Sequence, residues 1–234
     1  AYVFESLRPT PELSFAVREL GCVAGINVTA SHNPPEYNGY KVYWEDGAQI
    51  TPPHDTGIMD EVKAVTDWNT VKTMDKADAV AKDLYESIGA AIDDKYIEEL
   101  KKQVIHWDSI KEVGKDLKIV YTPLHGTGNI PARRVLKEIG FENVYVVPEQ
   151  ELPDGDFPTV SYPNPEAAEA FEPKRRMPIL FLQQTRMRIV SVYMLRIRRA
   201  ASTLHLPVIC PDVCWQIMRS PRERRHRDFL RMES

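Results

Sequence analysis

The stretch that decides the fold is Thr-Ala-Ser-His-Asn-Pro-Pro-Glu-Tyr-Asn-Gly-Tyr-Lys, residues 29–41. Its prolines exclude a regular helix or strand, and Gly39 permits an unusual backbone turn. Serine, asparagine, proline and glycine are the usual residues of surface turns, so a plain turn is the first interpretation. The same loop also exposes a serine hydroxyl beside an imidazole and an amide.

The segments on both sides of this loop favour a second interpretation. Cys22–Val28 and Tyr40–Trp44 are short apolar runs rich in β-branched and aromatic residues, which predicts two strands joined by the loop. Ala1–Glu5 predicts an earlier strand, and the apolar spacing of Pro11–Leu20 predicts a helix between them. The order strand, helix, strand puts Ser31 at the carboxyl end of a strand, where open α/β sheets bind ligands.

A serine at that position suits a phosphoryl carrier. The charge of its phosphate would be met by backbone N–H groups, by the imidazole of His32 and by the ammonium of Lys41. A serine hydrolase is the nearest rival, but no Gly-x-Ser-x-Gly elbow surrounds Ser31. The sequence therefore favours phosphoryl transfer over acyl transfer.

The thirteen residues resemble the phosphoserine loop of the α-D-phosphohexomutases, most closely in the phosphoglucomutase and phosphopentomutase branch. The likeness covers residues 1–172 and includes Leu-Arg-Pro-Thr-Pro at 7–11 and Thr-Pro-Leu-His-Gly-Thr-Gly at 122–128. The resemblance implies that Ser31 is the phosphorylated serine, which gives its phosphoryl group to a sugar phosphate and takes another back. It also implies that His32 and Lys41 orient and neutralise that phosphate.

The resemblance implies further parts of the site. Mg²⁺ is expected to bind the phosphate of Ser31 and three aspartates, and glucose 1,6-bisphosphate is the expected intermediate and activator. The implied reaction interconverts glucose 1-phosphate and glucose 6-phosphate, with phosphopentomutase or phosphomannomutase activity as the alternative. The residues expected to support the loop and surround the phosphate are Thr29, Asn33, Asn38, Gly39 and His125.

We predict an α/β fold built from mixed-sheet, three-layer domains of the phosphohexomutase type. Residues 1–112 would form the C-terminal part of the first domain, truncated at its N-terminus, and residues 113–172 the start of an incomplete second domain. A β-α-β arrangement in the second unit predicts a parallel strand pair. The remaining expected elements are helices at Asp60–Val65, Ala77–Ser87, Asp93–Val104 and Pro131–Ile139, and strands at Leu117–Tyr121 and Asn143–Val147.

The loop between Leu117–Tyr121 and Pro131–Ile139 leaves two interpretations open. Its glycines and the following helix N-terminus suit a phosphate cradle. Alternatively, Gly126 and Gly128 only permit a tight turn, and His125 only hydrogen-bonds the backbone.

Composition sets outer bounds on function. The 234 residues carry a formal net charge of −4 and three cysteines, which provide no disulfide framework. Cys210 and Cys214 lack the second ligand pair of a zinc site. No apolar run approaches the length of a membrane span and no secretory leader is visible, so a cytoplasmic location is expected. We expect a sugar phosphate partner, no nucleic acid and no membrane; the sequence does not fix an oligomeric state.

The net charge hides a sharp division along the chain. Residues 1–172 contain 16 Lys+Arg against 30 Asp+Glu, whereas residues 173–234 contain 14 against 4. The expected Mg²⁺ loop, of the type Thr-Asp-Pro-Asp-Ala-Asp-Arg, is replaced by Gln-Gln-Thr-Arg-Met-Arg at 183–188. These six residues offer no hard oxygen ligands of the kind that Mg²⁺ prefers.

Translation out of frame explains this tail. Because Met has one codon, Met177 before Pro178 must yield alanine in the shifted frame, and Trp215 before Gln216 yields alanine again. With permitted third bases, residues 175–194 give Ala-Asp-Ala-Asp-Ile-Val-Leu-Ala-Thr-Asp-Pro-Asp-Ala-Asp-Arg-Val-Gly-Val-Tyr, which contains the missing metal loop. We infer that residues 173–234 are a frameshift product and expect them to be irregular.

The competing interpretation of the tail is a basic, Arg-rich arm for nucleic acid or an acidic partner. The tail mixes Leu, Ile and Val with Arg in no regular pattern, which favours frameshifting. The coding DNA decides between the two, since an in-frame tail without the hidden codons would rule out frameshifting. Two classes remain: an isomerase that is a phosphotransferase by descent, or a non-catalytic fragment. In both cases the 234-residue chain itself is expected to lack mutase activity.

Overall fold

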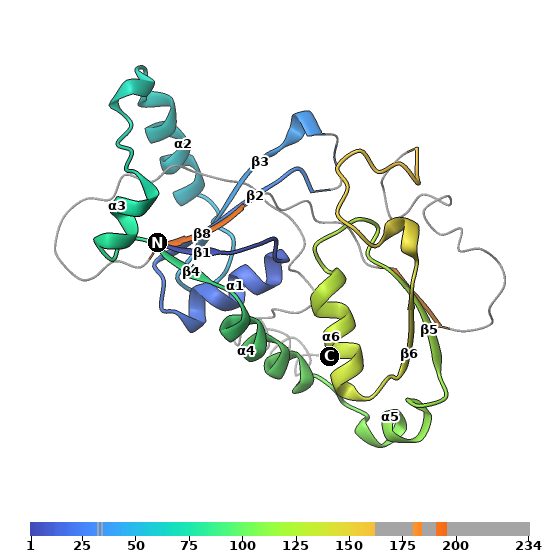
Figure 1. The fold of residues 1–234 in the computed structure, drawn as a ribbon. Helices are drawn as coiled ribbons and strands as arrows, with labels where there is room; N and C mark the ends of the chain where they lie inside the picture. The colour runs from blue at the N-terminus through green and yellow to red at the C-terminus, as the bar shows by residue number, and fades with distance from the viewer. Residues whose placement is uncertain (32, 34, 162–179, 184–190, 196–234) are drawn as a thin grey trace, which may run out of the picture.

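Two β-sheets with helices packed around them make up the computed structural model, which describes residues 1–31, 33, 35–161, 180–183 and 191–195 (Figure 1). The strands are β1 (Tyr2–Phe4), β2 (Ala24–Thr29), β3 (Gly39–Trp44), β4 (Glu86–Ile88), β5 (Lys118–Thr122), β6 (Asn143–Val146), β7 (Leu180–Gln183) and β8 (Ser191–Leu195). The α-helices are α1 (Thr10–Glu19), α2 (His54–Ala64), α3 (Lys76–Ala81), α4 (Ala90–Lys101), α5 (Trp107–Val113) and α6 (Asn129–Ile139). Short 3₁₀ turns are η1 (Pro35–Tyr37), η2 (Trp68–Thr70) and η3 (Pro148–Gln150).

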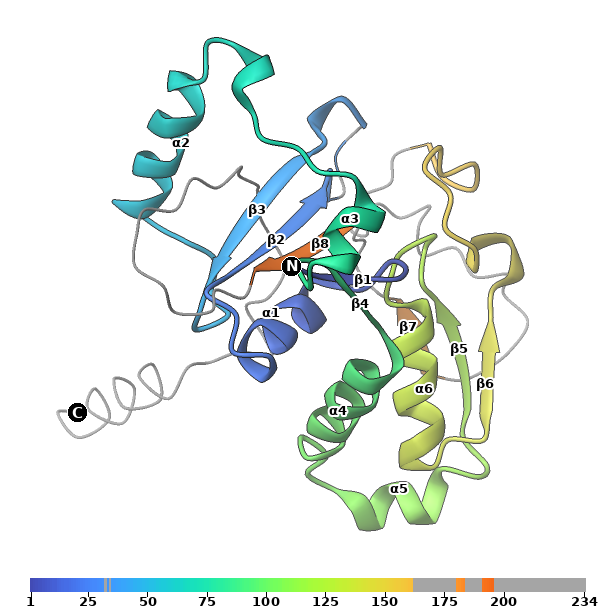
Figure 2. The same cartoon turned by 60° about the vertical axis from the view of Figure 1, so that its left-hand side comes forward.

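The first sheet is mixed and has the strand order β3-β2-β8-β1-β4 (Figure 2). β1 and β4 run parallel, and β2 and β3 pair antiparallel along their full lengths. β8 lies between β1 and β2 and is antiparallel to both. The predicted strand, loop and strand around Ser31 are therefore confirmed, with the loop joining two adjacent antiparallel strands.

Helices cover both faces of this sheet, which gives the expected three layers. On one face, Leu13, Ala16 and Val17 of α1 pack in a buried cluster with Phe4, Cys22, Tyr43, Ile88 and Ile92. On the other face, Ile58 and Val62 of α2 pack against Ile26 and Val42. Alternation along β2 and β3 separates the two sets, because successive side chains of a strand point to opposite faces.

The second sheet has the order β6-β5-β7, and β5 is parallel to both neighbours. The predicted parallel pairing of β5 with β6 is confirmed, with α6 as the connecting helix. Gly140 ends α6 with a left-handed backbone, φ 117°, as expected for a glycine directly after a helix.

One predicted helix is wrong over its second half. The expected helix at Ala77–Ser87 ends at Ala81, and Glu86–Ile88 forms β4 instead. Asp83 takes a left-handed backbone, φ 55°, which is incompatible with continuing the helix. β4 then pairs with β1, so tertiary pairing overrides the local helical pattern. The structure also starts α2 at His54 rather than Asp60, shifts α4 to Ala90–Lys101, and adds α5.

The expectation of an irregular tail is wrong for two segments. Leu180–Gln183 forms β7 beside β5, and Ser191–Leu195 forms β8 within the first sheet. Strand formation here needs only backbone hydrogen bonds. Without β7 and β8, the strands β1, β2 and β5 would each have an unpaired edge, and such an edge can pair with a short apolar segment of extended chain. The rest of the predicted irregular tail lies outside the described residues.

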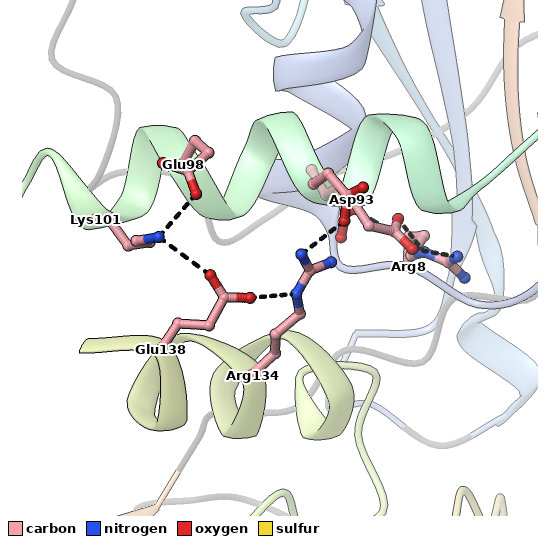
Figure 3. A network of polar contacts seen from close by, with 8 residues as sticks. Arg8, Asp93, Glu98, Lys101, Arg134 and Glu138 are labelled. Atoms are coloured by element: carbon pink, nitrogen blue, oxygen red, sulfur yellow. Dashed lines mark hydrogen bonds and ion pairs between the residues drawn. The ribbon is translucent and has the colours of Figure 1, made fainter. Parts of the chain in front are cut away.

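Ion pairs join α4 to α6, between the two sheets (Figure 3). Arg134 of α6 contacts Asp94 of α4 at 2.6 Å and Glu138 on its own helix at 2.7 Å. Lys101 of α4 contacts Glu138 at 3.2 Å and Glu98 at 2.7 Å. These contacts are partly exposed, so they orient the helices more than they stabilise the fold.

We predict that Gly25→Ala destabilises the first sheet. A Cβ at Gly25 would lie 2.5 Å from Val17 Cγ2 and 3.2 Å from Leu13 Cδ1, so α1 would have to move away from β2. Overpacking of this kind costs about 1–3 kcal/mol, which urea unfolding followed by circular dichroism would measure.

Gly57→Ala is the matched control for this prediction. A Cβ at Gly57 of α2 meets nothing within 4 Å, so the free energy of unfolding should stay the same or rise by up to about 1 kcal/mol. Equal unfolding midpoints for Gly25→Ala and the unsubstituted chain would contradict the close packing of α1 on β2.

Candidate functional site

Ser31 lies two residues beyond the end of β2 and has an unusual backbone. Its φ is 54°, in the left-handed region that residues with a side chain rarely adopt. Its N–H donates a hydrogen bond of 2.9 Å to Thr29 Oγ1, and both residues are buried. The hydroxyl of Thr29 therefore fixes the turn that presents Ser31, which gives a structural role to a residue predicted to support the loop.

The strand register places Lys41 on the same face of the β2–β3 pair as Thr29, the residue that holds the Ser31 turn. Lys41 pairs directly opposite Asn27, and Gly39 pairs opposite Thr29, so these four positions share one face of the β2–β3 pair. The Lys41 side chain is buried, with 1% of its surface exposed. The structure thus places the predicted lysine in the strand pair that precedes and follows the Ser31 loop, separated from the loop by the pairs Val28–Tyr40 and Thr29–Gly39.

The unusual turn predicted at Gly39 is instead found at Ser31. Gly39 is the first residue of β3, and its backbone is not among those with positive φ. The nearest atom to a Cβ placed on Gly39 is Tyr37 O, at an ordinary 3.8 Å. Gly39 therefore has neither a positive φ nor a close contact that would require glycine.

The middle of the loop combines a short turn with exposed side chains. The N–H of Asn33 donates to Ala30 O at 3.0 Å, which closes the turn around Ser31. Asn33 and Asn38 are exposed. His32, the predicted imidazole of the site, lies outside the described residues.

A buried polar contact joins α1 to the strand pair. Asn27 Nδ2 donates to Thr10 Oγ1 at 2.5 Å, and both residues are fully buried. Thr10 is the first residue of α1, so the contact fixes the start of that helix on the same face as Lys41. Sequence reasoning missed this pair, although an asparagine within the apolar run of β2 was a usable signal.

Arg8 ties the chain before α1 to α4. Its guanidinium contacts Asp93 through two hydrogen bonds of 2.7 and 2.8 Å and also donates to Ser6 Oγ at 2.5 Å. Burial alone raises the pKa of Asp93, but the hydrogen bonds from Arg8 hold that pKa below its ordinary value. The paired geometry fixes the segment that leads into Thr10.

Glu12 lies beside this ion pair within the protein interior. It has 1% of its surface exposed, and its Oε1 lies 3.9 Å from Arg8 Nε. Burial is the main cause that raises the pKa of Glu12 to about 9, and the neighbouring Asp93 carboxylate adds to it. Glu12 is therefore protonated and neutral at pH 7.

The loop between β5 and α6 positions His125 by several contacts. Its Nδ1 lies 2.9 Å from Leu152 O and its Nε2 lies 3.2 Å from Thr159 Oγ1, while its ring packs in a T-shaped arrangement with the ring of Phe157. The left-handed residues of the loop are Leu124 and His125, with φ of 46° and 59°, rather than its glycines. These contacts favour the interpretation in which His125 hydrogen-bonds the backbone and holds the loop to the segment after β6.

The described part of the chain holds no group of three or more His, Cys, Asp or Glu side chains arranged to bind a metal ion. The side chains described by the structure thus do not fit the expected Mg²⁺. Within the same residues, no helix is long and apolar enough to cross a membrane.

The fold and the Ser31 loop define a class of protein: a three-layer α/β domain with a strained serine at a strand end, followed by a second α/β unit. Sequence models of the phosphoglucomutase/phosphomannomutase family match residues 1–68 as α/β/α domain I and residues 94–177 as α/β/α domain II. Together they cover well over half of the chain. The chain belongs to the phosphohexomutase superfamily.

Curated relatives support this assignment. The phosphopentomutase of Homo sapiens is 40% identical over 166 residues, which are 70% of this chain and 26% of the relative. The glucose 1,6-bisphosphate synthase of Mus musculus is 42% identical over 172 residues, 72% of this chain and 27% of the relative. The phosphoribomutase of Saccharomyces cerevisiae is 37% identical over 173 residues, 70% and 28% of the two chains.

A solved structure described as a phosphomannomutase, from Thermus thermophilus, superposes with a TM-score of 0.56 and 26% sequence identity. The match covers 73% of this chain and 35% of that one. The chain thus spans about a quarter of the length of the curated relatives that it matches, and about a third of that solved structure.

We predict that Glu12→Gln makes stability less dependent on pH. The pKa of Glu12 is raised on folding, so the native state binds more protons than the unfolded state between about pH 4.5 and pH 9. Stability from this group is complete below that range and is lost as the pH rises through it, by at most about 1.4 kcal/mol per pH unit. Urea unfolding between pH 5 and pH 9 would measure the difference.

The glutamine keeps the neutral shape of protonated Glu12 and cannot ionise. The substituted chain should therefore gain stability relative to the original chain as the pH rises. A difference that stays constant from pH 5 to pH 9 would contradict a protonated Glu12.

Proposed function

We propose that the protein from which this chain derives is a phosphotransferase that interconverts sugar phosphates, with Ser31 as the carrier of the phosphoryl group. The observation that supports this most strongly is the placement of Ser31 in a left-handed turn at the end of β2, fixed by Thr29 Oγ1. Strained backbone of this kind is held in place at functional sites by the surrounding structure. The relatives named above support the same class of chemistry.

In the proposed reaction, the phosphorus–oxygen bond of phospho-Ser31 breaks as a hydroxyl of the sugar phosphate takes the phosphoryl group. The resulting bisphosphate then returns its other phosphoryl group to Ser31. Phosphoryl transfer depends mainly on positioning and on neutralising charge. The rigid β2–β3 pair provides the positioning, and we assign charge neutralisation to Lys41 and His32.

Glucose phosphates are the substrates that we propose first, with glucose 1,6-bisphosphate as intermediate and activator. The name of the mouse relative, glucose 1,6-bisphosphate synthase, supports a glucose bisphosphate. Pentose phosphates are the second candidate, because the human and yeast relatives are named phosphopentomutase and phosphoribomutase. A cytoplasmic location is part of the same proposal.

Mg²⁺ is proposed as a cofactor of the complete protein and not of this chain. The resemblance that implies the metal also implies three aspartate ligands, and the sequence has none at residues 183–188. Restoring the shifted reading frame would supply the aspartates.

We predict that a full-length protein with the reading frame restored interconverts glucose 1-phosphate and glucose 6-phosphate, and that Ser31→Ala abolishes this activity. Alanine removes the oxygen that carries the phosphoryl group. Ser109→Ala, at an exposed position in α5, is the matched control and should retain full activity. A coupled assay that reports glucose 6-phosphate would measure all three proteins, with ribose 1-phosphate tested alongside.

The 234-residue chain itself should show no turnover in the same assay. Activity of the frame-restored protein that survives Ser31→Ala would contradict the role of Ser31. A strong preference for ribose 1-phosphate would correct the substrate and leave the phosphotransferase class intact. A folded, inactive frame-restored protein would contradict the proposed phosphotransferase class.

A further inference from the structure

Helix α4 contacts the two units of the fold in chemically different ways. We call the first sheet with α1 and α2 the Ser31 unit, and the second sheet with α6 the second unit. Toward the Ser31 unit α4 is apolar: Ile92 belongs to the buried cluster of α1, and the ring centroids of Tyr96 and Phe15 are 5.6 Å apart. Toward the second unit α4 meets α6, a helix in which no residue is fully buried. An apolar core thus fixes α4 on the Ser31 unit, and α6 contributes no such core.

Four charged side chains, Asp94 and Lys101 of α4 with Arg134 and Glu138 of α6, connect the two helices (Figure 3). Arg134 contacts Asp94, and Lys101 Nζ donates a hydrogen bond of 3.2 Å to Glu138. Arg134 Nε also donates to Glu138 Oε1 at 2.7 Å. This hydrogen bond is the main cause that lowers the pKa of Glu138 below its ordinary value, so the carboxylate is ionised at pH 7. We call these four side chains the α4–α6 joint.

The order of charges along the two helices fits one register. Glu98 lies one turn before Lys101 on α4 and contacts it at 2.7 Å. Moving α6 by one turn, about 5.4 Å, toward the N-terminus of α4 would bring Glu138 beside Glu98, and the two carboxylates would repel each other. Moving α6 the same distance the other way would break both contacts between the helices. The joint therefore favours the observed register by attraction, and it opposes one of the two neighbouring registers by repulsion.

We propose that Arg134 is a positioning residue that sets, through Asp94, the angle between the second unit and the Ser31 unit, and that this angle changes when the charges of the joint are removed or screened. Contacts between units that are polar rather than apolar permit such movement. The catalytic part of the inference rests on the function proposed above, whereas the geometry of the joint does not. Because a misplacement of about 1 Å is enough to slow a reaction, a change in this angle would displace any group that the second unit brings to Ser31.

Distances between two spin labels on the full 234-residue chain test the geometry of the joint. The three natural cysteines are replaced by alanine, and labels are attached at two exposed positions, Lys63→Cys in α2 and Tyr145→Cys in β6. Double electron–electron resonance should give one narrow distance distribution for the intact joint. Arg134→Gln should shift or broaden this distribution, and Arg134→Lys, which keeps the charge, should restore most of it. A solution of about 1 M NaCl, in which the Debye length is about 3 Å, should change the distribution in the same direction as Arg134→Gln.

Arg133→Gln is the matched control, because Arg133 lies next to Arg134 on α6 but pairs with Glu151, within the second unit. Its label distances should equal those of the unsubstituted chain, and the urea midpoints of both variants should stay close to that of the unsubstituted chain. Unchanged distances in Arg134→Gln, or an equal change in Arg133→Gln, would overturn the proposal. If Arg134→Gln fails to fold, the salt titration of the unsubstituted chain decides, and distances that do not respond to salt would overturn the proposal.

The catalytic consequence is measured in the frame-restored, full-length protein. Arg134→Gln should lower kcat by about tenfold or more, since a misplacement of about 1 Å can cost about a hundredfold. Arg134→Lys and Arg133→Gln should retain most of the activity. A shifted label distance with an unchanged kcat would overturn the positioning role of Arg134. Absence of turnover in the unsubstituted protein would contradict the proposed function, and the label distances would still decide the geometry of the joint.

Discussion

The left-handed turn at Ser31 is the constraint on which the rest of the site depends. A residue with a side chain at φ 54° is strained by about 1–3 kcal/mol, and such strain persists only where the surroundings leave no alternative. Here the N–H of Ser31 is bound by Thr29 Oγ1, and Thr29 is held in β2 by pairing with β3. The position of the serine is therefore set by its hydrogen bond to a residue of the β2–β3 pair.

The contacts between α1 and the β2–β3 pair change from apolar to polar toward the Ser31 turn. Near the C-terminal half of α1 it is apolar and so close that Gly25 has no room for a Cβ against Val17. Near the start of α1 it becomes polar, with Asn27 bound to Thr10 and Lys41 opposite Asn27. Apolar packing thus sets the distance of the helix from the sheet, and the buried polar groups gather at the end of the helix nearer the Ser31 turn.

Arg8, Asp93 and Glu12 form a polar cluster that holds the chain before α1 in place. Arg8 binds Asp93 of α4 by two hydrogen bonds, while the neutral Glu12 lies alongside. A second carboxylate at that place would repel Asp93, so protonation of Glu12 makes the buried arrangement possible. The start of α1 is therefore held by β2, through the contact of Thr10 with Asn27, and by α4, through the contact of Arg8 with Asp93.

Local patterns in the sequence were sufficient for β2, β3 and the parallel pair of β5 with β6, since apolar periodicity and turn residues agree there. They were insufficient at Glu86–Ile88, where helical spacing continues but pairing with β1 imposes a strand. The unusual turn was expected at Gly39 because glycine is the usual choice, whereas the structure has it at Ser31, whose N–H donates to the nearby Thr29 Oγ1. The insertion of β8 between β1 and β2 depends on contacts too distant for any local pattern to reveal.

Mass spectrometry of the Ser31 peptide is the most direct test of the central claim, that this turn presents a phosphoryl carrier. The frame-restored, full-length protein would be incubated with glucose 1,6-bisphosphate, digested and compared with an untreated sample. The account predicts one added phosphoryl group, located on Ser31. An unmodified Ser31 in a protein that turns over sugar phosphates, or a phosphoryl group on a different residue, would contradict it.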